Sequence, residues 1–428
     1  MRRIITLVIL ATAALVAQNK DMNITGAGAR AEGFAGAYIG LADDATAVVW
    51  NPSGLTQLER LEASVVTRFR NDRVRFENNV DPALNAEESQ GNFSLNFGSV
   101  ALPMTLGGMK MVIAAAFQRQ LDFNESQTRV DEYPASGFLN PAYRQTERYR
   151  SEGGVNTITP AVGIQLLPIL SVGLAANIWT GSMDQSNKLE DSRFLITSFD
   201  EDTYTLDFSG LNFVVGAMLD LGGMKNGIPL KIGMTAKTPF ELTGSGSFSV
   251  RRRITGTLDA SGSAEATAEM PLMLGFGTSY RFGENLTVSM DYEMRMYGDK
   301  KLNTTVSAGA FTNSSSDDIS ESREDLNEFR IGAEYLVVTE SAVIPLRAGF
   351  KTVPSVDADY YYDGTVGDFL PTTTQSSGTG FALGTGFITN AFAFDVTYSH
   401  SAYDQKYDTY GVVKNVRGTL SSSIIIYF

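Results

Sequence analysis

From residue 61 to the end of the chain, apolar and polar residues alternate in short runs. Residues 286–297 show the pattern most clearly, with an apolar face made of Val288, Met290, Tyr292, Met294 and Met296. A period of two is typical of β-strands whose two faces meet different surroundings. The pattern predicts an all-β fold of about 14 antiparallel strands.

The predicted strands are joined alternately by tight turns and by long polar segments. The tight turns are expected near residues 103–109, 167–170, 222–228, 282–285, 338–341 and 389–391. The long polar loops are expected near residues 71–90, 121–153, 181–203, 242–265, 298–325, 353–377 and 402–414. Short turns on one rim and long loops on the other are typical of outer-membrane barrels, whereas a soluble sandwich has no reason to sort its loops by length. We therefore expect residues 61–428 to form a transmembrane antiparallel β-barrel.

Both ends of the chain favour export to an outer membrane. Two arginines precede a short apolar run over residues 4–16, and Ala17 offers a small residue for cleavage. This arrangement predicts a signal peptide over residues 1–17. At the other end the alternation continues to Phe428, and a last strand that ends in phenylalanine is similar to the assembly signal of bacterial outer-membrane proteins. We expect the protein in the cell outer membrane of a Gram-negative-type bacterium.

Composition restricts the chemistry and the partners of the chain. A net charge of −14 argues against a nucleic-acid partner, because binding to phosphates needs a basic face. The absence of cysteine excludes disulfides and thiolate metal sites. The one histidine, His400, is predicted on the opposite strand face from Ser399 and Ser401, so it cannot activate either hydroxyl. We expect no enzymatic activity, no catalytic residue, no cofactor and no metal site.

A segment rich in glycine and alanine lies between the signal peptide and the first strand. Residues 26–55 read GAGARAEGFAGAYIGLADDATAVVWNPSGL, with neither strand alternation nor a long helix. Strands about 4.8 Å apart and tilted by about 40° give a 14-stranded barrel a backbone diameter of roughly 28 Å. Because side chains alone cannot fill such a lumen, we predict that residues 18–60 fold into it as a plug.

Several residues in this segment predict a defined local structure. Asp43 or Asp44 can cap a short helix that follows them. Pro52 cannot continue that helix and forces Asn51 into an extended conformation. Trp50 is large and has one N–H to satisfy, which suits an anchor against the inner wall of the barrel.

The order of these features resembles the N-terminal hatch of the FadL/TodX family of outer-membrane transporters for long-chain fatty acids and other hydrophobic compounds. That family carries a run of small residues, an Ala-Asp-Asp-Ala element and an Asn-Pro-Ala motif in this order. The matching residues here are Ala42, Asp43, Asp44, Ala45, Asn51, Pro52 and Ser53, with Ser53 in place of the usual alanine. The hatch motif is therefore expected to comprise Asp43, Asp44, Trp50, Asn51, Pro52 and Gly54.

The resemblance implies uptake of hydrophobic small molecules through the barrel. The family's ligands are held in an apolar pocket and released through a side opening, while the hatch changes shape to let them pass. The partners expected for this chain are a hydrophobic small-molecule ligand and the lipids and lipopolysaccharide of an outer membrane, with no nucleic acid. We expect a monomer.

The strand patterns also predict which residues face the lumen and the ligand. The candidates on small or apolar faces are Ala114, Ala116, Gly173, Ala175 and Trp179. The candidates on charged faces are Asp291, Glu293, Arg295, Arg330, Glu334 and Arg347. Because so many charges face inward, the sequence does not predict a continuous apolar tunnel. An alternative therefore stays open, in which a FadL-like barrel binds a protein partner as part of a secretion machine, similar to the PorV barrels.

Overall fold

The computed structural model describes residues 26–428 apart from residues 134–141, 193–197, 255–257 and 310. The predicted signal peptide, residues 1–17, and the first part of the predicted plug, residues 18–25, lie outside the described residues.

The described part of the chain begins with short helices and continues as nineteen strand segments. The helices are α2 (Ala29–Gly33), α3 (Ala47–Trp50), η1 (Pro52–Gln57), η2 (Pro82–Leu84) and η3 (Leu221–Gly223). None of the helices in these residues has the length and apolar character needed to cross a membrane. The strands are β1 (Glu62–Asn78), β2 (Ala86–Leu106), β3 (Met109–Asp122), β4 (Glu125–Tyr133), β5 (Tyr143–Leu167), β6 (Leu170–Asp191), β7 (Ser198–Asp220), β8 (Leu230–Lys237), β9 (Phe240–Arg252), β10 (Leu258–Met270), β11 (Met273–Phe282), β12 (Leu286–Arg295), β13 (Lys301–Ala308), β14 (Phe311–Asp318), β15 (Leu326–Val338), β16 (Val343–Asp363), β17 (Asp368–Ile388), β18 (Phe392–Tyr407) and β19 (Gly411–Tyr427).

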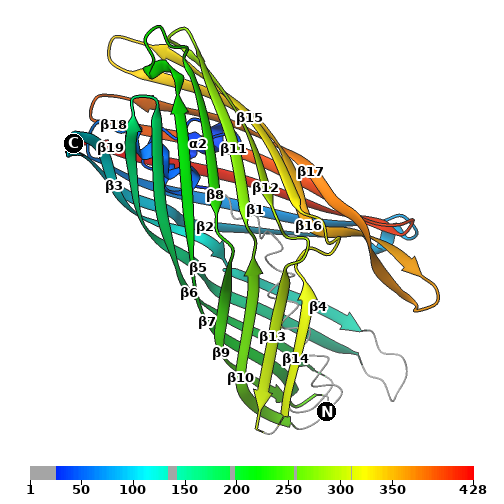
Figure 1. The fold of residues 1–428 in the computed structure, drawn as a ribbon. Coiled ribbons are helices and arrows are strands. Elements are labelled where there is room, and N and C mark those ends of the chain that lie inside the picture. Colours follow the sequence, from blue (N-terminus) through cyan, green and yellow to red (C-terminus); the bar gives the residue numbers. More distant parts are fainter. Residues whose placement is uncertain (1–25, 134–141, 193–197, 255–257, 310) are drawn as a thin grey trace.

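These segments form one closed antiparallel barrel, which Figure 1 shows from the side. The last strand, β19, pairs with the first, β1, along its whole length and closes the barrel. Ten of the segments lie end to end in pairs, namely β3 with β4, β8 with β9, β10 with β11, β12 with β13 and β14 with β15. The barrel therefore has 14 staves, and the prediction of about 14 antiparallel strands is confirmed.

The predicted tight turns are confirmed on one rim of the barrel. They occupy residues 107–108, 168–169, 221–229, 283–285, 339–342 and 389–391. The predicted long loops are wrong for the most part, because those residues continue the strands. Residues 71–90, for example, contain the ends of β1 and β2, and residues 353–377 contain the ends of β16 and β17. Beyond a membrane both strand faces meet water, so the alternation of side chains is lost while the backbone pairing continues.

Toward the opposite rim the wall divides into two lobes. The described residues show no backbone pairing between β2 and β4, or between β14 and β16. The eight-stranded lobe contains β4, β9, β10, β13, β14 and the far ends of β5, β6 and β7. The six-stranded lobe contains the far ends of β1, β2, β16, β17, β18 and β19. Figure 1 shows the two lobes diverging, with β13 and β14 in one and β16 and β17 in the other.

The outer face of the barrel near the tight turns is apolar. Exposed outward side chains there include Val100, Leu174, Val215, Phe276, Leu346, Leu383 and Ile424. A closed barrel pairs its backbone polar groups internally, and such a belt matches the hydrocarbon of a bilayer. The barrel therefore has the two properties that membrane-spanning strands require.

Candidate functional site

Residues 26–60, called the inner segment below, lie inside the barrel near the rim with the tight turns (Figure 1). Helix α2 contacts β16, β17, β18 and β19, and η1 contacts β3, β5, β6 and β7 on the other side. The side chains of the segment that are fully buried include Ala27, Ala29, Ala31, Phe34, Ala37, Tyr38, Ile39, Ala47, Val48 and Leu55. The inner segment therefore occupies the lumen at this level.

Glycines on the inner wall let the segment approach the strands closely. A Cβ atom at Gly173 would lie 2.2 Å from the carbonyl carbon of Pro52, and one at Gly216 would lie 2.1 Å from Asn51 Oδ1. Neither site could hold a larger residue without moving the segment. Similar contacts, below 3.0 Å, would be made by a Cβ atom at Gly233, Gly277, Gly332 and Gly349.

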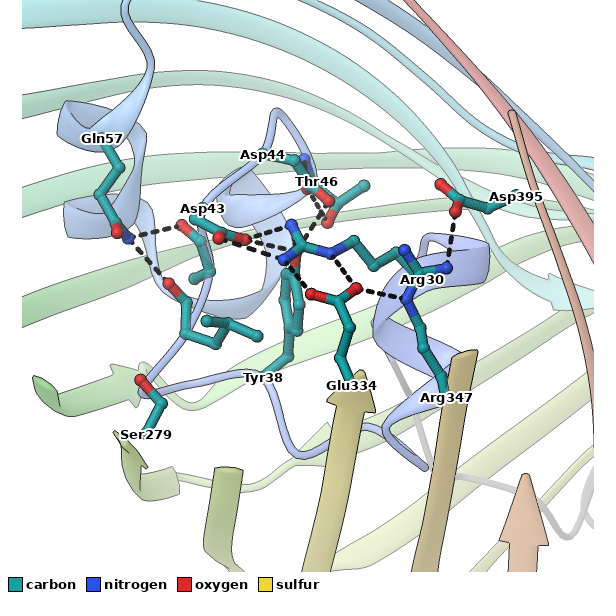
Figure 2. A network of polar contacts seen from close by, with 12 residues as sticks. Arg30, Tyr38, Asp43, Asp44, Thr46, Gln57, Ser279, Glu334, Arg347 and Asp395 are labelled. Carbon is teal, nitrogen blue, oxygen red and sulfur yellow. Dashed lines mark hydrogen bonds and ion pairs between the residues drawn. The ribbon is translucent and has the colours of Figure 1, made fainter. Parts of the chain in front are cut away.

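A buried network of charges joins the inner segment to three strands of the wall (Figure 2). Arg30 donates to both carboxylate oxygens of Glu334 on β15, each at 3.1 Å, and to Asp43 Oδ1 at 2.5 Å. Arg347 on β16 donates from Nε to Glu334 Oε2 at 2.6 Å. Its Nη1 donates to Asp395 Oδ1 on β18, also at 2.6 Å. Arg30 therefore ties two parts of the segment to each other and to the wall.

The two adjacent aspartates have different surroundings. Burial opposes the ionisation of Asp43, but Arg30 holds the pKa of this carboxyl below its ordinary value. Burial raises the pKa of Asp44, and the neighbouring charge of Asp43 adds to the rise. The hydroxyl of Tyr38 lies 3.0 Å from Asp43 Oδ1 and 2.8 Å from Asp44 Oδ2. Asp43 is therefore the charged partner of Arg30, whereas ionisation of Asp44 is disfavoured.

The prediction that Asp43 or Asp44 caps the following helix is wrong. Helix α3 begins at Ala47 with Thr46 as the preceding residue, and no side chain caps it. Asp44 Oδ1 instead accepts from the backbone N–H of Thr46 at 2.8 Å and closes a turn before the helix. The carboxylate of Asp43 is not available as a cap, because it pairs with Arg30.

Trp50 contacts the wall with its ring but not with its N–H. Its Nε1 donates to the carbonyl oxygen of Ala27 at 2.8 Å, inside the segment. The guanidinium of Arg330 on β15 lies over the ring, with 5.8 Å between its central carbon and the ring centroid. Trp50 thus fastens the start of the segment to α3 and meets the wall through a cation–π contact.

The Asn51–Pro52 pair shapes the segment as predicted. Asn51 is extended, with φ −157° and ψ 100°, and Pro52 opens η1. Asn51 Nδ2 also donates to the carbonyl oxygen of Ala217 on β7 at 3.3 Å, a wall contact that the sequence did not predict. Gly54 packs against Ala42, where a Cβ atom would lie 2.2 Å from the carbonyl oxygen. The motif residues therefore fix the turn and its contact with the wall.

The structure places the small lumen-facing candidates against the inner segment. Ala114, Ala116 and Ala175 are buried in one apolar cluster with residues of the segment. Gly173, as described, lies directly under Pro52. Trp179 belongs to a second apolar cluster, together with residues of β7, β9, β10 and β13. The small candidates are therefore packing sites for the segment, and Trp179 is not among them.

The charged candidates divide into three groups. Asp291 Oδ2 accepts from the backbone N–H groups of Tyr38 and Ile39, at 2.6 and 2.7 Å. Glu334 and Arg347 belong to the network around Arg30. The remaining candidates pair with one another and with Glu328 in the wall, and these are Glu293, Arg295 and Arg330.

Three residues of the Arg30 network were not predicted as site residues. Arg30 is the one basic residue between positions 26 and 59, and the same segment contains Asp43 and Asp44. An ion pair between Arg30 and one of these aspartates could therefore have been predicted from the sequence. Asp395 follows the outward-facing Phe394 on β18, so strand alternation predicts that its side chain faces the lumen. Tyr38 carried no signal, because a buried tyrosine is common in any core.

A cavity of about 450 Å³ lies above the inner segment, between it and the lobes. Its floor is formed by Ala35, Gly36 and Trp50 of the segment. Apolar side chains on its wall are Leu121, Phe123, Met183, Leu326, Val353 and Val356. Charged side chains on its wall include Arg68, Asp72, Glu328, Arg330, Lys351 and Arg417. The cavity is therefore amphipathic, and the inner segment separates it from the rim with the tight turns.

Comparison with known proteins identifies the fold and the family. None of the curated proteins matches the chain. A FadL homologue from Pseudomonas aeruginosa superposes with a TM-score of 0.62 at 11% identity, covering 95% of this chain and 99% of that one. The monoaromatic hydrocarbon channel CymD gives 0.62 at 14%, covering 95% and 98%. The toluene transporter TodX of P. putida gives 0.61 at 13%, covering 95% and 99%.

At such identities these structures establish the fold alone, and the resemblance to FadL and TodX is confirmed at that level. The family model described as BamG matches residues 34–351, which include most of the inner segment and most of the barrel. The chain therefore belongs to the BamG family and has the 14-stranded barrel fold of the FadL and TodX channels.

Proposed function

We propose that the chain is a channel for small hydrophobic molecules in the outer membrane of a Gram-negative bacterium, with the inner segment as its hatch. The observation that carries the proposal is the cavity whose floor is the inner segment. Contacts between this segment and the wall are hydrogen bonds, ion pairs and packing, which a conformational change can break and restore. A molecule held in the cavity would pass when the segment moves.

The lining of the cavity supports an amphiphilic ligand. Leu121, Phe123 and Met183 offer an apolar surface for a hydrocarbon tail. On the charged side, the nearest carboxylate oxygen to Lys351 Nζ, that of Glu328, is 3.8 Å away. Lys351 is thus only weakly paired and suits the carboxylate of a fatty acid. Similar solved structures are named as toluene and hydrocarbon channels, which favours transport over enzymatic activity.

Binding measurements on two variants test this proposal. Lys351→Met should weaken the binding of a long-chain fatty acid to the purified barrel about tenfold and leave toluene binding unchanged. Lys300→Met, on a turn outside the cavity, is the matched control and should change neither. Leu121→Asp should weaken both ligands, because it places a charge on the apolar wall. If none of the variants alters binding, the cavity is not the ligand site.

The division into two lobes favours a second candidate function, in which the barrel binds a protein partner. Lobes of polar strands with unpaired edges are not needed for passage of a small molecule. The seams between the lobes are, however, suited to recognition of another chain.

A further inference from the structure

At the seam between β2 and β4, two strand edges face each other. Within the part of the chain that the structure describes, residues 86–95 of β2 pair with β1 alone, and residues 125–133 of β4 pair with β5 alone. The last pairing between β2 and its neighbour β3 is that of Phe97 with Gln118. Each edge therefore presents a row of backbone N–H and C=O groups, the usual template for an added strand.

A side chain bridges the two edges. Gln90 on β2 spans the seam, and its Nε2 donates to the carbonyl oxygen of Asn124, just before β4, at 2.9 Å. The bridge between the two strands is therefore made by a side chain, and the described residues show no backbone ladder between them. The cavity opens into this seam, since both Gln90 and Asn124 line it.

The seam is also acidic at its base. Glu88 on β2 and Glu125 on β4 both line the cavity from opposite edges. Burial and the charge of Glu88 raise the pKa of Glu125, which lies beyond the apolar belt. Among the described residues, neither carboxylate forms an ion pair within 4.0 Å. The charge of Arg70, which also lines the cavity, opposes the rise in the pKa of Glu125, and Gln127 donates to Glu125 Oε1 at 2.7 Å. The two edges thus carry like charges, and in the described residues neither is closed by a direct ion pair.

We propose that this seam binds an extended, basic segment of another protein, whose backbone pairs with the free edges of β2 and β4. A lysine or arginine of that segment would lie between Glu88 and Glu125. A small cation could neutralise the two carboxylates, but it would leave the rows of backbone groups unpaired. An extended chain satisfies both, which is the mode known as strand addition. This inference does not rest on the transport of a small molecule.

Peptide binding to the full-length barrel in detergent tests the proposal. The probe is a fluorescent peptide of alternating lysine and valine, measured by anisotropy. A version of equal charge with prolines at alternate positions lacks the backbone donors and should bind at least tenfold more weakly. Equal binding of the two peptides would mean simple charge attraction and would overturn strand addition. Competition by spermidine as strong as that of the peptide would identify a cation site and would also overturn it.

Variants of the chain locate the site. The double variant Glu88→Gln with Glu125→Gln should weaken binding of the lysine–valine peptide about tenfold. The control pair Glu265→Gln with Asp368→Asn, at exposed sites elsewhere, should not change its binding.

A second test closes the seam while keeping both carboxylates. Because the chain has no cysteine, Gln90→Cys with Asn124→Cys can be joined by a short bismaleimide. The joined barrel should lose the peptide and the unjoined one should keep it. Binding that survives the cross-link contradicts the proposal.

Discussion

Arg30 is the residue whose removal should release the inner segment most strongly. It donates to both oxygens of Glu334 at 3.1 Å and to Asp43 at 2.5 Å (Figure 2). Arg30→Met keeps the apolar stem and removes the charge, so Asp43 loses its cation. Breaking a buried ion pair by removing one partner costs about 3–5 kcal/mol. Because 18% of the Arg30 side chain and 26% of the Asp43 side chain are exposed, the lower end applies.

A cost of about 3 kcal/mol corresponds to a change of roughly 100-fold in the equilibrium constant between the docked and the released state of the segment. A cysteine placed at Ala31, which is fully buried, reports this equilibrium through its rate of reaction with a small maleimide. In the Ala31→Cys background, Arg30→Met should raise the labelling rate by roughly 100-fold when the segment closes again faster than the maleimide reacts. The double variant Arg30→Met with Asp43→Asn should be labelled more slowly than Arg30→Met alone, because it no longer contains the unpaired Asp43 carboxylate.

Arg60→Met is the matched control for this experiment. Arg60 is the last residue of the inner segment, is exposed, and donates to the carbonyl oxygen of Asn390 outside the Arg30 network. Its removal should leave the labelling rate unchanged. A rate for Arg30→Met equal to that of the control would refute the argument that the buried charges hold the segment in the lumen.

Further substitutions test the packing, the hydrogen bonds and the two aspartates. Gly173→Leu should displace Pro52 and raise channel conductance in planar bilayers, since even a Cβ atom there would lie 2.2 Å from the segment. Asn51→Leu should cost about 1–3 kcal/mol, because a buried carbonyl loses its donor, and hydrogen exchange of the segment should accelerate. Asp43→Asn should accelerate exchange more than Asp44→Asn, because it removes the charge that pairs with Arg30. As the docked pKa of Asp43 lies below its ordinary value, its contribution is present at neutral pH and declines as the pH falls below that ordinary value. Conductance that stays the same throughout an acid titration would contradict this.

The sequence predicted those parts of the fold that a local pattern encodes. Strands within the apolar belt alternate strictly, so their faces and their tight turns could be read directly. The small residues of positions 26–55, combined with the width of the barrel, predicted where that segment lies. The far ends of β1 and β2 were predicted as a loop. Strands that are exposed to water on both faces do not alternate between apolar and polar residues, so the pattern did not identify them.

The contacts that hold the segment are long-range and therefore carry no local signal. Arg30 and Glu334 are 304 positions apart, and the sequence around either residue does not indicate which residue it pairs with. The wall glycines have the same property, since Gly173 and Gly216 match Pro52 and Asn51 only after the barrel has closed. The aspartate cap was wrong for this reason as well, because Asp43 is engaged by Arg30.

The most direct test of the hatch is conductance of the barrel without the inner segment. A chain lacking residues 26–58 should still form the closed barrel, because the closing pairs join β1 to β19 and involve none of these residues. Retained β-structure by circular dichroism would verify this. In planar bilayers the shortened barrel should give a steady open conductance, while the intact chain stays closed apart from brief openings. A folded, shortened barrel that conducts no better than the intact chain would contradict the account.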